Sequence, residues 1–198
     1  MKYITILHAN LNYAYLPERR YEFVIRNSYE LIFDTFREKL PKDEYVFEAS
    51  GYTIEQMALK TPDVLEKLKA AIKSGQCEFM GSPYAHPMLP NFPEEDGNWS
   101  IRFSNEAYQK HLGIQPKSFW NPECGWRSYV KNQVLNNGYQ NLLQEFEQYS
   151  RSVDAAGQPL RPEIHAVEKI DNSKFYNFEF KYDLPGDERG IHFPFKNV

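Results

Sequence analysis

Short apolar runs alternate with longer amphipathic segments along most of the chain. Runs rich in β-branched and aromatic residues over Tyr3–Leu7, Tyr45–Ala49, Gln76–Met80 and Lys117–Trp120 predict buried strands. Between the first two runs, apolar residues recur at spacings of three and four over Glu18–Leu40, which predicts a long amphipathic helix. This repeat of strand and helix is typical of an α/β fold with a parallel sheet.

Local signals predict the start and end of the other helices. Thr53, with Gln56 three residues later, has the spacing of a capping box and predicts the start of a short helix. Thr61-Pro62-Asp63 predicts the start of another helix, which Gly75 ends. The remaining predicted elements are helices over Asn98–Gly113 and Ser128–Asn136 and a fifth strand over Tyr139–Leu143.

The pattern changes in the C-terminal part of the chain. Ile164–Ile170 and Phe175–Tyr182 alternate apolar and polar residues on either side of Asp171-Asn172-Ser173, which predicts a β-hairpin. We interpret residues 144–190 as a loop and hairpin inserted into a single α/β domain that spans residues 1–198. The segment Phe193–Val198 has no helix stop or polar tail, which predicts a chain cut in mid-fold.

Composition and charge narrow the classes of function. The chain has 198 residues, of which 41% are hydrophobic, 25% charged and 16% aromatic, as in a globular protein with one sizeable core. A net charge of −4 and a pI near 5.8 argue against nucleic acid or an anionic membrane as a main partner. No run approaches the ~20 apolar residues of a transmembrane helix. We therefore expect a cytoplasmic protein in which Cys77 and Cys124 are reduced thiols.

The segment Phe119–Trp126 is the strongest candidate for chemistry. Pro122 fixes its own φ and favours an extended Asn121, so Glu123 is presented after a strand with little freedom. Indole rings flank this carboxylate in the sequence, and their apolar faces suit the C–H groups of sugar rings. The alternative is an ordinary turn with core tryptophans and a solvated glutamate.

Other candidates lie at or near the ends of predicted strands, where parallel α/β folds bind ligands. His8 follows the first strand. Glu78 in the third strand is expected to point to the face opposite Cys77 and Phe79, which would be the interior if the sheet closes into a barrel, and a buried carboxylate there needs a partner. The long proline-rich loop Gly81–Pro93 is of a kind that is commonly functional. A core histidine and a rigid surface loop are the structural alternatives. The candidate substrate-binding residues are His8, Asn10, Glu78, Tyr84, His86, Trp120 and Trp126.

Two of these stretches resemble conserved blocks of glycoside hydrolase family 57. Trp120-Asn121-Pro122-Glu123, followed by a small residue and an aromatic, resembles the family's nucleophile segment. Gly75–Pro87 resembles the preceding block, and both occur in the family's order and at a similar separation. Where the family usually has His-Gln-Pro, this chain has His8-Ala9-Asn10, so only the histidine matches. The resemblance extends from the N-terminus to about Tyr139.

The resemblance implies a fold and an activity. The family uses an incomplete, seven-stranded (β/α) barrel, of which this chain would hold the first half to two-thirds, because closed barrels typically need about 250 residues. Its members hydrolyse or transfer α-glucans with retention of configuration, which makes Glu123 the nucleophile and requires no cofactor or metal. The family's acid/base is an aspartate from a later strand, and the cluster Asp183–Glu188 does not match that block. No acid/base is therefore assigned.

Three alternatives remain open besides the enzyme. A non-catalytic glucan-binding or regulatory module would use the same scaffold without turnover. A nucleophilic Cys124 has no supporting sequence signature. A metal-dependent deacetylase would need a set of histidine and aspartate ligands. His8 and His86 offer two ligands, but no aspartate accompanies His8 and no H-x₃-H pair occurs among the five histidines. The oligomeric state is also open.

The enzyme interpretation makes two geometric predictions. His8, Glu78, His86 and Glu123 should converge at the C-terminal end of the sheet. The carboxylate of Glu123 should be partly buried, flanked by Trp120 or Trp126, and hydrogen-bonded by a group such as His8. Such donors would offset the rise in pKa that burial causes in a carboxyl group.

Overall fold

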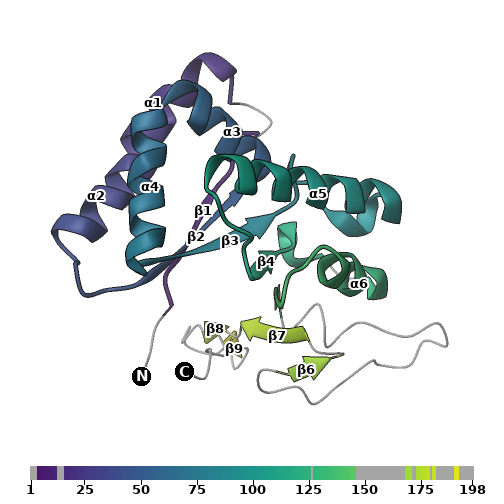
Figure 1. Cartoon of the computed structure of the whole chain (residues 1–198). Coiled ribbons are helices and arrows are strands. Elements are labelled where there is room, and N and C mark those ends of the chain that lie inside the picture. The colour runs from purple at the N-terminus through teal and green to yellow at the C-terminus, as the bar shows by residue number, and fades with distance from the viewer. Residues whose placement is uncertain are drawn as a thin grey trace.

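The structure, a computed structural model, describes residues 4–12, 16–125, 127–145, 168–170, 173–178, 180–181 and 190–191. A parallel sheet lies at its centre (Figure 1). Its first five strands follow chain order: β1 (Ile6–Ala9), β2 (Tyr45–Ser50), β3 (Cys77–Ser82), β4 (Ser118–Trp120) and β5 (Asn141–Glu145). The parallel, sequential arrangement predicted from the repeat of strand and helix is confirmed.

Helices connect the strands. They are η1 (Glu18–Arg20), α1 (Tyr21–Val24), the π-helical turn η2 (Ile25–Tyr29), α2 (Glu30–Glu38), α3 (Gly51–Lys60), α4 (Pro62–Ser74), η3 (Leu89–Asn91), α5 (Glu94–His111), η4 (Pro122–Cys124) and α6 (Ser128–Asn136). The first four follow one another without a break, so the predicted long helix forms with a π-helical turn inside it. Among the residues described, no helix has the length and apolar character that crossing a membrane requires.

The two faces of the sheet differ in chemistry because successive side chains in a strand point to opposite sides. On the outer face Phe47, Phe79 and Phe119 are buried in the two clusters that contain the helices' apolar side chains. The inner face has a smaller cluster that includes Val46 and Met80. On this inner face, the apolar side chains of the cluster alternate with polar side chains along the strands. A candidate site can therefore form only on the inner face or beyond the strand ends.

Several predicted boundaries shift, among them the end of β1 and the start of α3. β1 extends to Ala9, so His8 lies within the strand rather than just after it. The start of α3 is capped by Ser50, not Thr53, because Ser50 has extended backbone geometry and its hydroxyl accepts the N–H of Thr53. The hydroxyl of Thr53 instead accepts the N–H of Leu11 at 3.1 Å. This bond fixes the segment that follows β1.

The C-terminal part is described only as short strands. β7 (Ser173–Phe178) pairs parallel with β5 and antiparallel with β6 (Glu168–Ile170), and β8 (Phe180–Lys181) pairs antiparallel with β9 (Gly190–Ile191). Most of the predicted insertion at 144–190 lies outside the described residues. The hairpin insertion and the seven-stranded barrel therefore stay predictions.

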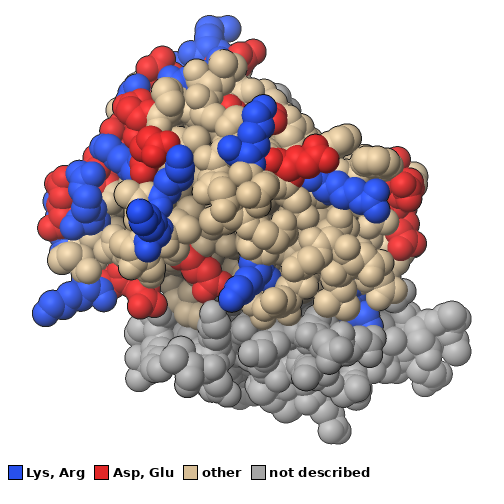
Figure 2. Space-filling model, viewed as in Figure 1, with Lys and Arg blue, Asp and Glu red and all other residues tan. Residues whose placement is uncertain are grey.

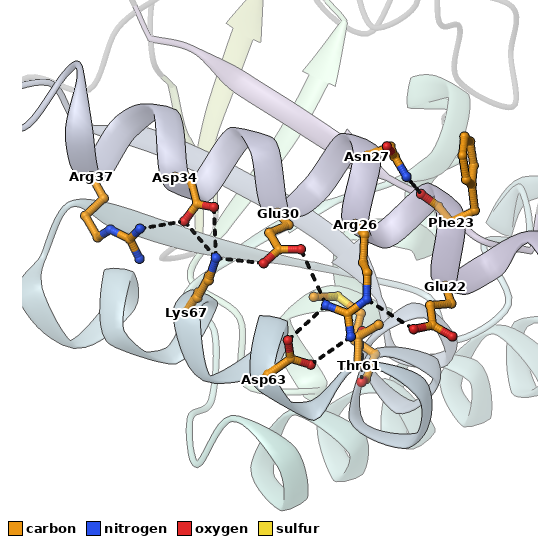
Figure 3. Close-up of polar contacts among 11 residues, drawn as sticks. Glu22, Phe23, Arg26, Asn27, Glu30, Asp34, Arg37, Thr61, Asp63 and Lys67 are labelled. Atoms are coloured by element: carbon orange, nitrogen blue, oxygen red, sulfur yellow. Dashed lines mark hydrogen bonds and ion pairs between the residues drawn. The ribbon is translucent and has the colours of Figure 1, made fainter.

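Charged side chains connect the first helical segment to α4 on the outside of the fold (Figure 3). Lys67 of α4 lies 2.7 Å from a carboxylate oxygen of Glu30 and 2.8 Å from one of Asp34. These two carboxylates, Asp34 more than Glu30, raise the pKa of Lys67. Arg26 makes a two-point contact with Asp63 at 2.9 and 3.2 Å. Figure 2 shows acidic and basic side chains interspersed over this part of the surface.

The half-buried Lys67 should contribute more to stability than a lysine paired within one helix. We expect Lys67→Met to lower the free energy of unfolding by about 0.5–1 kcal/mol, because Lys67 connects two helices through two carboxylates. The matched control is Lys69→Met, since among the residues described Lys69 pairs only with Glu66 of its own helix, at 2.7 Å. Urea denaturation measures both, and the difference should shrink in ~1 M salt. Equal losses in the two variants would contradict this account.

Candidate active site

A fully buried carboxylate, that of Glu48, lies on the inner face of β2 near the C-terminal end of the strand. Parallel pairing places His8 of β1 directly opposite Glu48, and Nδ1 of His8 donates a hydrogen bond to Oε2 of Glu48. The other carboxylate oxygen, Oε1, lies 3.9 Å from Nε2 of His86, which is too long for a hydrogen bond. Together these three residues form the histidine–glutamate cluster.

Aromatic contacts enclose the histidine–glutamate cluster. His86 follows β3 in the loop and has a left-handed backbone with φ 57°, and its side chain is only 10% exposed. The ring centroids of His8 and His86 are 4.8 Å apart. Trp120, at the end of β4, packs edge-on against His8 at 4.6 Å and against His86 at 5.8 Å. Side chains from the ends of four neighbouring strands therefore meet at one place.

Burial shifts the pKa values of two members of the cluster, Glu48 and His86. It raises the pKa of the Glu48 carboxyl, and the hydrogen bond from His8 opposes that rise. Burial also lowers the pKa of His86 to about 4, with a smaller contribution from the charge of His8. His86 is therefore neutral near pH 7, and its 3.9 Å approach to Glu48 is no ion pair despite the short distance. Oε1 of Glu48 and Nε2 of His86 are both buried without a hydrogen-bond partner among the described residues.

Glu123 lies in a tight turn beyond β4, and its side chain is exposed. Glu123 and Cys124 both have left-handed backbones, with φ of 56° and 49°. Such conformations are unfavourable for residues other than glycine and cluster at functional sites. The turn is braced by its own side chains: Asn121 donates to the carbonyl of Gly125, and the indole N–H of Trp120 donates to the sulfur of Cys124 at 3.4 Å.

The prediction that Glu123 is partly buried is wrong. Glu123 lies three residues past the end of β4, outside the buried layer of the sheet, and its side chain is exposed. The predicted donor His8 uses Nδ1 to bind Glu48, its register partner, instead. Trp126, the other predicted neighbour, lies outside the described residues.

The predicted convergence at the end of the sheet holds for His8 and His86 but is wrong for Glu78. β3 continues to Ser82, so Glu78 is near the start of the strand, in register with Val46. Its carboxylate accepts a hydrogen bond from the hydroxyl of Ser118 at 2.8 Å. Glu78 therefore lies on the inner face, but two residues below the level of Glu48.

Asn10 and Tyr84, two further candidates, make hydrogen bonds outside the histidine–glutamate cluster. The side-chain oxygen of Asn10 accepts the N–H of Asn12 at 3.0 Å. The hydroxyl of Tyr84 donates to Glu55 of α3 at 2.5 Å. Within the described part of the chain, neither makes a hydrogen bond to the histidine–glutamate cluster.

Glu48 is the residue that the sequence analysis missed. A usable signal was present, because Glu48 is the one charged residue in the run Tyr45–Ser50, and that run forms a buried parallel strand. In such a strand a carboxylate must have a partner or a ligand. The same argument was applied only to Glu78, whose side chain is exposed near the start of its strand.

Comparison with known proteins identifies the family of this chain. The model of "Glycosyl hydrolase family 57" matches residues 1–183. Alpha-amylase 1 of Dictyoglomus thermophilum is 27% identical over 130 residues, which are 64% of this chain and 19% of that protein. The chain thus spans about a fifth of the length of the curated relatives it matches.

Solved structures show the same fold. The alpha-amylase AmyC from Thermotoga maritima superposes with a TM-score of 0.69 at 16% identity, over 88% of this chain and 45% of that one. A branching enzyme from Thermococcus kodakaraensis, solved in complex with glucose, gives 0.59 at 16% identity, over 94% of this chain and 46% of that one.

The lowered pKa of His86 predicts a loss of stability in acid. The unfolded chain takes up a proton at this histidine near pH 6.5, whereas the folded protein resists protonation until about pH 4. The stability contributed by neutral His86 is complete above pH 6.5 and is lost as the pH falls toward 4. His86→Asn removes this titration, and asparagine tolerates a left-handed backbone. Its free energy of unfolding should therefore fall less steeply than that of the wild type across this window.

Denaturation at a series of pH values measures this difference. The raised pKa of Glu48 acts in the opposite direction, but Glu48 is present in both proteins, so the comparison isolates His86. His111→Asn, at the end of α5, is the matched control and should follow the wild type. Parallel curves for the wild type and His86→Asn would show that the argument from burial is wrong.

Proposed function

Because the chain belongs to glycosyl hydrolase family 57, we propose that it forms part of a retaining enzyme that acts on α-glucans, with Glu123 as the nucleophile. The observation that carries this proposal is the exposed carboxylate of Glu123 on a braced, left-handed turn after β4. Parallel α/β folds bind their ligands at this end of the strands. An exposed side chain there is accessible to a sugar.

The proposed reaction uses two carboxyl groups about 5–5.5 Å apart. An oxygen of Glu123 attacks the anomeric carbon, the glycosidic bond breaks, and the leaving oxygen takes a proton from an acid. Water or a sugar hydroxyl then attacks the anomeric carbon, returns a proton to the group that acted as the acid, and displaces Glu123, which gives hydrolysis or transfer. In this proposal Glu123 supplies the first carboxylate, and none of the described residues is assigned as the second.

His8 has a supporting role in this proposal. Because its Nδ1 is hydrogen-bonded to Glu48, the other ring nitrogen, Nε2, is left to hydrogen-bond a sugar hydroxyl. The His8 side chain is 38% exposed, while Glu48 is fully buried. Glu48 therefore acts through His8 as a positioning residue, and Trp120 holds the ring from the side.

The second candidate function is a glucan-binding module without turnover. It is favoured by one observation, namely that no acid/base is assigned in the part of the chain that the structure describes. The candidate cluster Asp183–Glu188 lies outside that part. Both functions predict sugar binding, and only the enzyme predicts a covalent intermediate.

A mechanism-based label tests the nucleophile without needing the acid. In 5-fluoro-α-glucosyl fluoride, the carboxylate of Glu123 attacks the anomeric carbon, the C–F bond breaks, and fluoride leaves without protonation. We expect intact-protein mass spectrometry to show one fluoroglucosyl group per chain, and peptide analysis to place it on Glu123. Glu123→Gln should remain unlabelled, whereas Glu78→Gln should label like the wild type. A label on another residue contradicts the proposal, and sugar binding without any label favours the binding module.

Trp120 should contribute more to the affinity for sugar than Trp99 does. We expect Trp120→Ala to weaken maltoheptaose binding by at least about 10-fold, or ~1.4 kcal/mol, because it removes the ring that holds His8 and His86. Trp99→Ala is the matched control, since Trp99 is 45% exposed on α5 and packs against Phe103. Isothermal titration calorimetry measures both. Equal losses of affinity in the two variants would show that Trp120 is not part of the proposed site.

A further inference from the structure

Two buried polar atoms of the histidine–glutamate cluster have no hydrogen-bond partner among the described residues. Ligand atoms of His8, Glu48 and His86 all lie within 4.8 Å of one another. Oε1 of Glu48 and Nε2 of His86 face each other at 3.9 Å, both buried and both without a hydrogen-bond partner among the described residues. Leaving buried polar atoms unpaired is unfavourable, so a third group that binds both would stabilise this arrangement.

The spacing fits a shared metal ion better than a direct contact. Two ligands on one tetrahedral zinc ion, with bonds of ~2.0–2.2 Å, are separated by ~3.3–3.5 Å. The observed 3.9 Å needs only a small side-chain movement to reach that value. His8 is already hydrogen-bonded to Glu48, so an ion that replaces the proton of that bond requires the His8 ring and the carboxylate to move apart to this separation.

The donor set also selects the kind of ion. Two imidazoles and one carboxylate suit zinc and similar transition metals, whereas calcium and magnesium prefer all-oxygen sites. Imidazole binds metals in its neutral form. The ligands come from β1, β2 and the loop after β3, and the register between β1 and β2 fixes two of them.

We propose that His8, Glu48 and His86 bind one divalent transition-metal ion, with zinc as the best fit. Three protein ligands leave a fourth position open, as in zinc sites that exchange water or substrate. That position would lie on the side of His8, whose side chain is 38% exposed, beside Trp120. It would accept a water molecule or a sugar hydroxyl. The site is independent of Glu123, and the resemblance described above did not imply it.

Calorimetry with zinc chloride alone tests the proposal on chelator-treated protein of full length. The wild type should bind one zinc ion per chain. His8→Ala and Glu48→Gln should each weaken binding by more than about 100-fold, since losing even a second-shell partner costs about 10- to 100-fold. His111→Ala and Glu123→Gln should bind like the wild type. The Glu123 variant separates this proposal from the proposed nucleophile, because its zinc binding does not depend on glucan chemistry.

Separate controls test whether each variant folds and whether a residue outside the cluster binds the metal. His8 is the most exposed of the three ligands, so His8→Ala decides the test if Glu48→Gln does not fold. Zinc should raise the melting temperature of the wild type but not of a folded His8→Ala. With cobalt in place of zinc, the absorption spectrum should indicate nitrogen and oxygen ligands in a tetrahedral site. No zinc binding by the wild type, unchanged binding in His8→Ala, or a thiolate-to-cobalt band from Cys124 would each overturn the proposal.

Discussion

The burial of the Glu48 carboxylate is the constraint on which the candidate site depends. A carboxylate withdrawn from water needs partners, and His8 supplies one because the parallel register places it opposite Glu48. A slip of one residue in β2 would turn Glu48 toward the outer face and Phe47 toward the inner one. Phe47 is fully buried in the main core, so the packing of the helices fixes the register and, through it, the site.

A second buried group fixes the ends of the neighbouring strands. The hydroxyl of Tyr108, on α5, donates to the carbonyl of Ala49 at 2.6 Å and accepts the N–H of Ser82 at 3.1 Å. Tyr108 is fully buried, so these bonds hold the last residues of β2 and β3 together away from water. The loop that carries His86 starts at this fixed point. The position of His86 near Glu48 therefore follows from a contact on the other face of the sheet.

Features set by local chemistry were predictable from the sequence, and features set by distant contacts were not. The bounds of α6 match the prediction, and Gly75 ends α4 with φ 81°, because turn and capping residues act on their neighbours. The role of Glu48 depends on the pairing of two strands about 40 positions apart in the chain, which no local pattern specifies. The exposure of Glu123 depends on the left-handed turn that Glu123 and Cys124 adopt, which the sequence did not indicate.

The two carboxylates of this region differ in what they can do. Glu48 is fully buried and bonded to His8, so a sugar cannot reach it, and it can only orient a ring or hold an ion. Glu123 is exposed on a braced turn and can meet a substrate directly. Trp120 connects them, because its ring packs on His8 while its N–H bonds the sulfur of Cys124, next to Glu123. Among the residues described, the side chain of Trp120 therefore links the histidine–glutamate cluster to the turn that carries Glu123.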